Sequence, residues 1–229
     1  MKVRLVSFSQ PTVEFEQEGI ENAQDLVAFC ARVSNPSNQF NTETSERLIK
    51  YLIRHQHWSP LEMVSACLEI TTTRDIARQI LRHRSFSFQE FSQRYADPTK
   101  DLNFVLRDLR FQDQHNRQNS IEIDYNNDKH RQIAYQWENL QKELISRTRE
   151  TYEWAISKGI AKEQARAVLP EGLMESRLYM NGTLRSWIHY IELRSANGTQ
   201  QEHTEVARAC ATVIAGIFPL AQELSSGSH

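Results

Sequence analysis

A run of β-branched residues, Ile70 to Thr73, constrains the fold more than any other feature of the chain, because it predicts a strand. Residues 74–83 return at once to helical spacing, so this strand runs directly into a helix. Four further segments have apolar residues at helical spacing: residues 22–33, 43–56, 183–194 and 201–216. Residues 2–8 and 175–181 have the pattern of strands. This mixture, without internal repeats, predicts an α+β fold in which a sheet packs against helices.

The middle of the chain is less regular. We expect residues 84–126 to be irregular, with a short strand at residues 104–106 and a polar surface loop at residues 112–120. Residues 128–158 predict a long, polar helix. A shorter helix is expected from about residue 160 to 168, ended by Pro170.

The length and charge of the chain bound its class. With 229 residues, 39% apolar residues and a net charge of −2, it is expected to be soluble, with one domain over residues 1–220. The small, polar end of the chain predicts a tail over residues 221–229, outside the domain. We see no signal peptide and no membrane-length apolar window, so we expect a cytoplasmic protein without membrane or nucleic-acid partners.

The three cysteines, Cys30, Cys67 and Cys210, are widely spaced and odd in number, which argues against a disulfide framework. None belongs to a C-x-x-C pair, so we expect no cysteine-based metal site. Each lies among apolar neighbours, and free cysteines in such surroundings usually pack as small hydrophobic residues. The sequence therefore predicts buried, structural thiols.

The segment from Arg78 to Tyr95 is the most informative for function, because four arginines and a histidine fall within it. Arginine presents a planar fork of donors that matches phosphate oxygens. Arg82, His83 and Arg84 follow a predicted helix end, where they can surround a diphosphate. Ser92 and Arg94 alternate, so in an extended segment they would share a face that binds a second phosphate.

Other interpretations of this segment remain open at this point. Charge runs usually form a solvated surface paired with carboxylates, although only Asp75 and Glu90 lie nearby in sequence. The interleaved aromatic residues also suit single-stranded nucleic acid, although the net charge of −2 weighs against a dedicated binder. A third alternative is a structural oligomer with a solvated basic face.

Two further sites attract attention. Arg185 and His189 lie four residues apart, and Arg194 lies on the same predicted helix; the alternative is a surface helix with a satisfied histidine. Arg166 is flanked by apolar residues, so it is expected to be half-buried and to need an anion, which could be a structural carboxylate.

The spacing Arg82-His83-Arg84, seven residues, Ser92, one residue, Arg94 resembles the signature of the flavin-dependent thymidylate synthases, the ThyX family, and Ser87 also matches. Further blocks are similar to that family: Ala31–Ser34, His57–Glu62, Ala165–Pro170 and Arg185–Arg194. The resemblance covers residues 30–97 and 128–216 and leaves 98–127 uncovered.

The resemblance implies a central sheet flanked by helices, a homotetramer, and active sites shared between subunits. It implies conversion of dUMP to dTMP, with methylenetetrahydrofolate as one-carbon donor and NADPH as reductant through FAD, without an enzyme cysteine nucleophile. FAD contacts are implied for Ser59, Arg82, His83, Arg84, Ser85, Glu90, Thr183, Leu184, Arg185 and His189. Contacts with dUMP are implied for Gln79, Arg82, Glu90, Phe91, Ser92, Gln93, Arg94, Arg166 and Arg194.

Arg194 is the residue to which the resemblance assigns a catalytic role, since it would lie against the uracil ring and favour ionisation at N3. One departure from the family is Thr183, which stands where members often have asparagine. We expect Arg194 and Gln79 of one chain to face Ser92, Arg94 and Arg166 of another, because one short loop can hardly surround two large anionic ligands.

Overall fold

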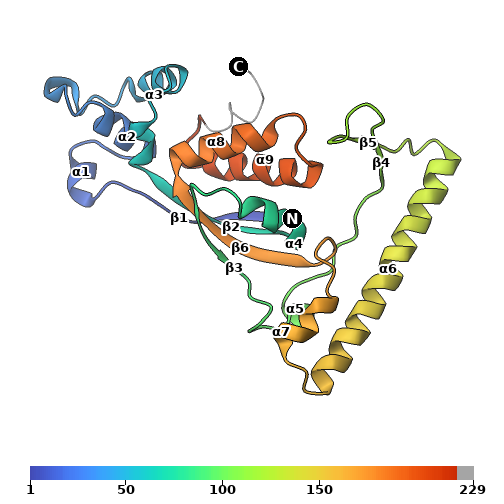
Figure 1. Cartoon of the computed structure of the whole chain (residues 1–229). Helices are drawn as coiled ribbons and strands as arrows, with labels where there is room; N and C mark the ends of the chain where they lie inside the picture. Colours follow the sequence, from blue (N-terminus) through green and yellow to red (C-terminus); the bar gives the residue numbers. More distant parts are fainter. Residues whose placement is uncertain (221–229) are drawn as a thin grey trace.

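The centre of the fold is a four-stranded antiparallel sheet in the order β1-β2-β6-β3 (Figure 1). The computed structural model describes residues 1–220, so the predicted tail over residues 221–229 lies outside the described residues. The strands of the sheet are β1 (Lys2–Phe8), β2 (Ser65–Thr73), β3 (Ser87–Glu90) and β6 (Glu175–Thr183). The strands predicted at residues 2–8, 70–73 and 175–181 are confirmed, and β3 joins them from a segment that was expected to be irregular.

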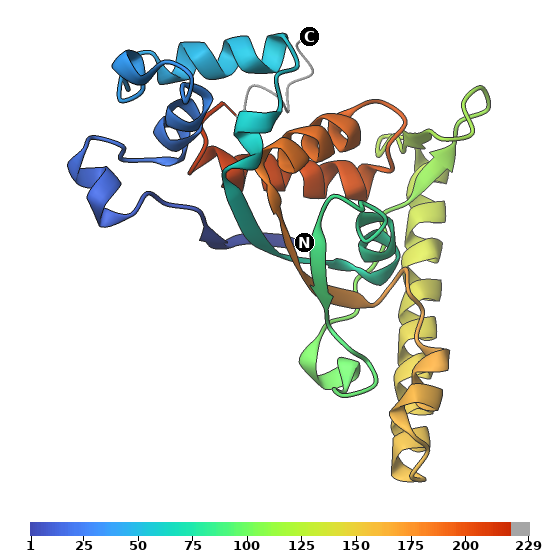
Figure 2. The same ribbon diagram turned by 60° about the vertical axis from the view of Figure 1, so that its left-hand side comes forward.

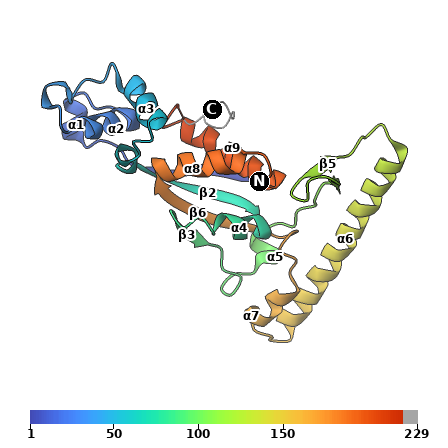
Figure 3. The ribbon, with the colours of Figure 1, turned by 45° about the horizontal axis from the view of Figure 1, so that its top comes forward.

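The sheet has a buried face and an exposed face. Along β6, Ser176, Leu178 and Met180 are buried, whereas Arg177 and Tyr179 are exposed, which is the alternation of a sheet covered on one side. Two helices, α8 (Leu184–Ser195) and α9 (Gln201–Ala215), lie over the buried face (Figures 1 and 3). The predicted α+β fold, with a sheet flanked by helices, is confirmed.

Helices from the first half of the chain complete the main core. They are α2 (Ala23–Ala31), α3 (Ser45–Arg54) and α4 (Arg74–Ile80), with the 3₁₀ turn η2 (Ser59–Glu62). The short helix α1 (Val13–Gln17) and the 3₁₀ turn η1 (Pro36–Asn38) have no buried residues and contribute none to this core. α4 follows β2 without a loop, as the sequence predicts. Trp187 is fully buried at the centre of this core and donates from Nε1 to the carbonyl of Ala66 at 3.0 Å.

A second, smaller hydrophobic cluster lies at the other end of the sheet. It is formed around Leu102, Tyr152, Leu169 and Met174, with Phe91 packed against it. The elements there are α5 (Pro98–Asp101), α6 (Asp128–Ser157), α7 (Lys162–Ala165) and η3 (Arg166–Val168). The long helix α6 stands beside the sheet and reaches past it towards α7 (Figures 1 and 2). No helix of residues 1–220 combines the length and apolarity that a bilayer crossing requires.

Parts of residues 84–126 are more ordered than the sequence predicts. Besides β3 and α5, two short strands, β4 (Arg110–Gln112) and β5 (Ser120–Glu122), flank the polar loop as a hairpin. The expected strand at residues 104–106 is reduced to an isolated bridge between Phe104 and Met174. These strands are short and mostly polar, so they lack the alternation that identifies a strand in a sequence.

Residues 92–94 do not form the extended segment in which Ser92 and Arg94 would share a face. β3 ends at Glu90, and the chain then turns, with the Tyr95 N–H donating to the Ser92 carbonyl at 3.1 Å. The Arg94 N–H also faces the Ser92 hydroxyl at 3.4 Å. The physical reason is that Phe91 packs into the second cluster, which draws the chain away from the sheet.

Gly182→Ala should lower the free energy of unfolding by about 1–3 kcal/mol, because a Cβ at this position of β6 would lie 2.4 Å from the Phe86 ring. Phe86 is itself wedged against Trp187, with ring centroids 4.8 Å apart. Urea unfolding measures the effect. Gly172→Ala is the matched control, since its Cβ would meet only an Asp75 oxygen at 4.0 Å. Equal losses in the two variants would contradict this account of the packing.

Candidate functional site

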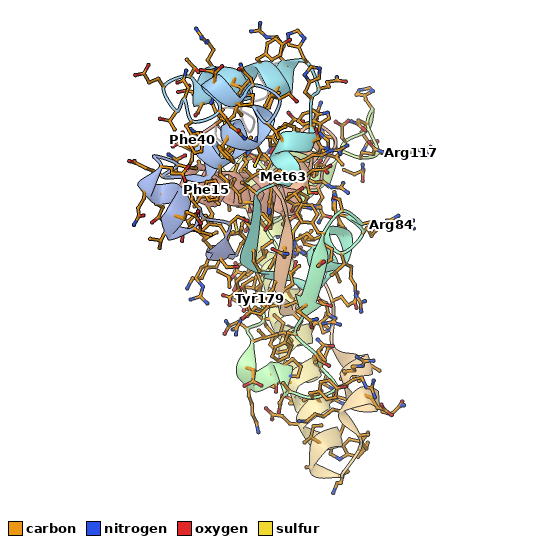
Figure 4. The ribbon with its side chains drawn as sticks, turned by 90° about the vertical axis from the view of Figure 1, so that its left-hand side faces the viewer. Phe15, Phe40, Met63, Arg84, Arg117 and Tyr179 are labelled. Carbon is orange, nitrogen blue, oxygen red and sulfur yellow. The ribbon has the colours of Figure 1, made fainter. Side chains whose placement is uncertain are left out.

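The turn that follows α4 presents arginine side chains to solvent. α4 ends at Ile80, and the N–H groups of His83 and Phe86 donate to the carbonyls of Ile80 and His83, at 3.0 and 3.2 Å. Phe86 is buried and anchors the turn, whereas Arg82 and Arg84 are exposed. Figure 4 shows Arg84 projecting away from the body of the chain.

Arg82 and Arg84 have no carboxylate partner among residues 1–220. Arg78, one turn earlier, does pair with Glu171, at 3.2 Å. A solvated surface of paired charges therefore describes Arg78 but not the two arginines of the turn. Their donors are available to an anion such as a phosphate.

Arg194 reaches back from α8 to this turn. Its Nε donates to Nε2 of His83 at 2.9 Å, so His83 accepts at Nε2 and carries its proton on Nδ1. The terminal nitrogens Nη1 and Nη2 of Arg194 have no partner in the described part of the chain. His83 thus fixes the direction of the guanidinium group while leaving its outer edge available to a ligand.

A buried histidine that the sequence did not identify lies next to the contact between Arg194 and His83. His203 of α9 is fully buried; its Nδ1 lies 3.2 Å from Gln79 Oε1 and its Nε2 lies 3.2 Å from the Tyr190 hydroxyl. Since an amide oxygen only accepts, His203 carries its proton on Nδ1 and accepts from Tyr190. Gln79 also donates to Gln200 at 2.8 Å. The signals for this group were the four-residue spacing of Tyr190 and Arg194 and a histidine in an apolar helix.

Both histidines are held neutral. Burial and the charge of Arg194 lower the pKa of His83 to about 4. Burial lowers the pKa of His203 to about 3, with smaller contributions from Arg194 and His83. We define the α4–α8–α9 group as Gln79, His83, Tyr190, Arg194 and His203. In this group Arg194 carries the only full charge near neutral pH.

Glu90 is the last residue of β3 and lies opposite Leu178 of β6. One of its carboxylate oxygens accepts from the Ser176 hydroxyl at 2.8 Å and lies 3.4 Å from Nη1 of buried Arg74. Neither Arg74 nor Ser176 was identified from the sequence, because these contacts join residues far apart in the chain. They fix one oxygen of Glu90, while the other has no hydrogen bond or ion pair with any of residues 1–220.

Arg94 and Arg166 lie on the far side of Glu90, next to α7. Arg94 pairs with Glu163 of α7 at 3.3 Å, and Arg166 follows that helix directly. Arg166 is half-buried, as the sequence predicts, and no carboxylate of residues 1–220 pairs with it, so the alternative of a structural ion pair does not hold there. Gln93 is buried, and its Nε2 has no hydrogen-bond partner among the described residues. We define the α7 group as Ser92, Gln93, Arg94 and Arg166, which contains donors that still need an acceptor.

The first turn of α8 holds the remaining candidates. Thr183, at the position of the family asparagine, caps the helix by accepting from the Ser186 N–H at 3.3 Å. Ser186 in turn donates to the carbonyl of Ser85 at 3.2 Å. This bond connects the cap of α8 to the turn that contains Arg82 and Arg84, which we call the arginine turn. Leu184 is buried, and its N–H donates to Val64.

Two side chains further along α8 meet η2. Arg185 is ion-paired with Glu62, and exposed His189 packs edge-on against Trp58 with centroids 4.4 Å apart. Ser59, also in η2, is exposed. The structure thus gathers the predicted flavin residues, apart from Glu90, around the first turn of α8, η2 and the turn after α4.

The three cysteines do not hydrogen-bond to these groups within residues 1–220, although Cys210 lies close enough to Tyr190 to raise the pKa of its hydroxyl. Cys210 is buried as predicted, but Cys30 and Cys67 are only half-buried. Burial raises the pKa of all three thiols, which disfavours the thiolate that a nucleophile requires.

Comparison with known proteins agrees with the resemblance seen in the sequence. A family model described as "Thymidylate synthase complementing protein" matches residues 17–220. The chain is 47% identical to a probable flavin-dependent thymidylate synthase of Paramecium bursaria Chlorella virus 1, over 96% of each chain. It is 44% identical to a flavin-dependent thymidylate synthase of Synechocystis, again over 96% of each.

A solved structure supports the same assignment. The crystal structure of a UMP/dUMP methylase from Streptomyces cacaoi bound with 5-Br dUMP superposes with a TM-score of 0.76 at 25% identity, covering 98% of this chain and 94% of that one. The matches span nearly the whole chain, so they include both the arginine turn and the α7 group. The chain belongs to the flavin-dependent thymidylate synthase family.

Proposed function

We propose that the protein methylates dUMP to dTMP, with FAD as the flavin, methylenetetrahydrofolate as the one-carbon donor and NADPH as the reductant. The observation that carries this proposal is the pair of unpartnered, exposed arginines, Arg82 and Arg84, next to the Arg194–His83 contact. A cofactor that carries a diphosphate could therefore bind next to a uracil ring whose negative charge Arg194 stabilises. Family membership supports the choice of reaction.

The residues present fit FAD. Arg82 and Arg84 would bind its diphosphate through charge-assisted hydrogen bonds, and the neighbouring Ser85 adds a hydroxyl. The other residues proposed to line the flavin are Ser59, His83, Glu90, Thr183, Leu184, Arg185 and His189. Thr183 cannot replace an asparagine amide, since its hydroxyl already caps α8, so we assign it to positioning that turn. When bound, FAD supplies the hydride that completes the methyl group.

The residues proposed for dUMP come from both groups. Arg94 and Arg166 suit a monophosphate, with Ser92 and the unpaired amide of Gln93 as additional donors. Phe91, Glu90, Arg82 and Gln79 complete the proposed nucleotide contacts. A phosphate would compete with Glu163 for Arg94, and this exposed ion pair is weak enough to exchange.

Arg194 is the proposed catalytic residue. Methyl transfer needs an electron-rich C5 on the pyrimidine, and loss of the N3 proton would supply that electron density. A guanidinium group stays protonated at any physiological pH, and its free edge can stabilise negative charge on the uracil ring. His83 holds the guanidinium in place beforehand, so little reorganisation is needed during the reaction.

The complete site is proposed to be built by two subunits of a homotetramer. Within one chain, the α4–α8–α9 group borders the main core, whereas the α7 group borders the second cluster. In Figures 1 and 3, α8 and α9 lie above the sheet, whereas α7 lies below it. Both groups could contact the same nucleotide if the α7 group of a second chain lay next to Arg194 of the first chain.

Arg82→Ala and Arg84→Ala should each weaken FAD binding about 10- to 100-fold, because each removes a charge-assisted contact worth about 1.5–3 kcal/mol. Fluorescence titration of flavin-free protein measures the affinity. Arg78→Ala is the matched control, since Arg78 is already paired with Glu171 and should change FAD affinity little. Unchanged affinity in both turn variants would show that the turn is not the flavin site.

The direct test of the proposed function is binding by the purified protein. We expect a yellow protein, or a colourless one that takes up FAD, whose flavin spectrum then changes on addition of dUMP. A protein that binds single-stranded nucleic acid but neither FAD nor dUMP would overturn the proposal.

A further inference from the structure

The segment from Phe104 to Gln112 crosses the molecule outside the blocks that resemble the family signature. Arg107 lies in its middle and makes polar contacts with four other parts of the chain. Only 16% of its side chain is exposed, although it lies in a segment without regular secondary structure. A mostly buried guanidinium group must have hydrogen-bond and ion-pair partners that compensate its charge, so its position in an irregular segment depends on those partners.

The backbone of Arg107 is attached to α6. Its N–H donates to Gln141 Oε1 at 2.7 Å, and its carbonyl accepts from Gln141 Nε2 and Trp137 Nε1, both at 3.0 Å. Gln141 is itself buried. The position of Arg107 is therefore set by the long helix before its side chain makes any contact.

The side chain of Arg107 then holds the start of α4. Nη2 donates to Thr73 Oγ1 at 2.6 Å and to both oxygens of Asp75, at 2.6 and 2.8 Å. Nε donates to the carbonyl of Gly172 at 2.9 Å, in the loop before β6. Thr73 is the residue before α4 and Asp75 lies in its first turn, so these bonds fix the helix at its N-terminal end.

The same guanidinium reaches the start of α9. Nη1 of Arg107 lies 3.3 Å from Glu202 Oε1, and Arg110 donates to the same oxygen. Two arginines thus face two carboxylates, Asp75 and Glu202, and the local charge is balanced. Both arginine side chains are only 16% exposed and Glu202 only 19%, so solvent screens these ion pairs weakly.

Arg107 joins α4 and α9, the two helices whose residues determine where the Gln79 amide lies. Gln79 lies one turn after Asp75 on α4, and its amide contacts His203 and Gln200, which flank Glu202 at the start of α9. Both amide atoms are used, so one N–H and one lone pair of Gln79 remain for a ligand. A shift of α9 relative to α4 would turn this amide.

We propose that Arg107 is a positioning residue for dUMP binding: by joining the starts of α4 and α9, it fixes the direction in which Gln79 presents its amide. The inference rests on the proposed function, in which Gln79 contacts dUMP. Arg107 itself does not belong to the site; it acts through Asp75 and Glu202.

A double-mutant cycle tests this role, with the dissociation constant for dUMP measured by titration of the FAD-loaded protein. Arg107→Gln is expected to weaken dUMP binding about tenfold, and Gln79→Ala to do the same. If Arg107 acts through Gln79, adding Arg107→Gln to Gln79→Ala should cause almost no further loss. Equal losses in the two backgrounds, or no loss from Arg107→Gln in the wild type, would overturn the proposal.

Two more variants separate positioning from stability. Arg107→Lys keeps the charge but not the fork that joins Asp75 to Glu202, so it should weaken dUMP binding even though it folds more readily than Arg107→Gln. Arg131→Gln, which breaks an exposed pair with Asp128 on α6, should leave dUMP affinity unchanged. A lower melting temperature for Arg107→Lys with unchanged dUMP affinity would show a structural role only. Wild-type protein that fails to bind dUMP would instead refute the proposed function.

Discussion

Arg194→Ala and Arg94→Ala should each reduce methyl transfer at least 10²- to 10³-fold, yet subunits of the two inactive variants, mixed under conditions of exchange, should regain activity. The reason is that a site shared between two chains needs Arg194 from one and Arg94 from the other. With random mixing in equal amounts, about a quarter of the sites contain both arginines, so about a quarter of the wild-type activity should return.

The structure supplies a matched control for this experiment. Gln79 and Arg194 belong to the same group, linked through His203 and the His83 turn, so a mixture of Gln79→Ala and Arg194→Ala subunits places both losses in the same half of the site. No site in this mixture can have both Gln79 and Arg194 intact, whichever chain supplies the other half, so the mixture should show no more activity than its Gln79→Ala subunits show alone. Recovery is therefore expected only in the first mixture. Failure of the first mixture despite proven exchange, or equal recovery in the second, would contradict the shared site.

Acid should destabilise the fold from about pH 6.5 downwards, before its carboxylates begin to titrate. Folding lowers the pKa of His83 to about 4 and that of His203 to about 3, from an ordinary value of 6.5. Above pH 6.5 both states of the chain hold these histidines neutral. Below it the unfolded chain binds protons that the folded chain refuses, so stability falls as the pH falls. The loss should total about 3–5 kcal/mol between pH 6.5 and 4.5.

Urea unfolding at a series of pH values measures this dependence. His203→Gln removes one of the two groups while keeping an amide that can hydrogen-bond to Gln79 or Tyr190, so its stability should fall about half as steeply over the same range. His115→Gln is the control, because His115 is exposed in the polar loop between β4 and β5. An identical pH dependence in wild type and His203→Gln would contradict a neutral, buried His203.

The sequence predicts the fold where the pattern of side chains is strong. The strand-to-helix junction at Thr73 and Arg74 follows from a β-branched run before helical spacing, and it positions the arginine turn. The half-buried Arg166 was likewise predictable from its apolar neighbours. In both places the information is local, so a single sequence carries it.

What the sequence could not predict depends on distant contacts. His203 and Gln79 are separated by more than a hundred residues, and nothing in the apolar pattern of α9 says that this histidine meets an amide. The turn at Ser92 forms because Phe91 packs against the second cluster, which contains residues of α6 and α7, and a local pattern does not contain this contact. Tertiary packing overrides local spacing at such positions.

The central claim is that a bound flavin, and not an enzyme cysteine, carries the chemistry of this protein. The most direct measurement is dTMP formed from dUMP, methylenetetrahydrofolate and NADPH, with and without FAD, by Cys30→Ala, Cys67→Ala and Cys210→Ala. Each folded variant is expected to make dTMP when FAD is present and none when FAD is removed, with at most some stability lost to small cavities. Loss of turnover in any one folded variant, or dTMP formed without flavin, would contradict the claim.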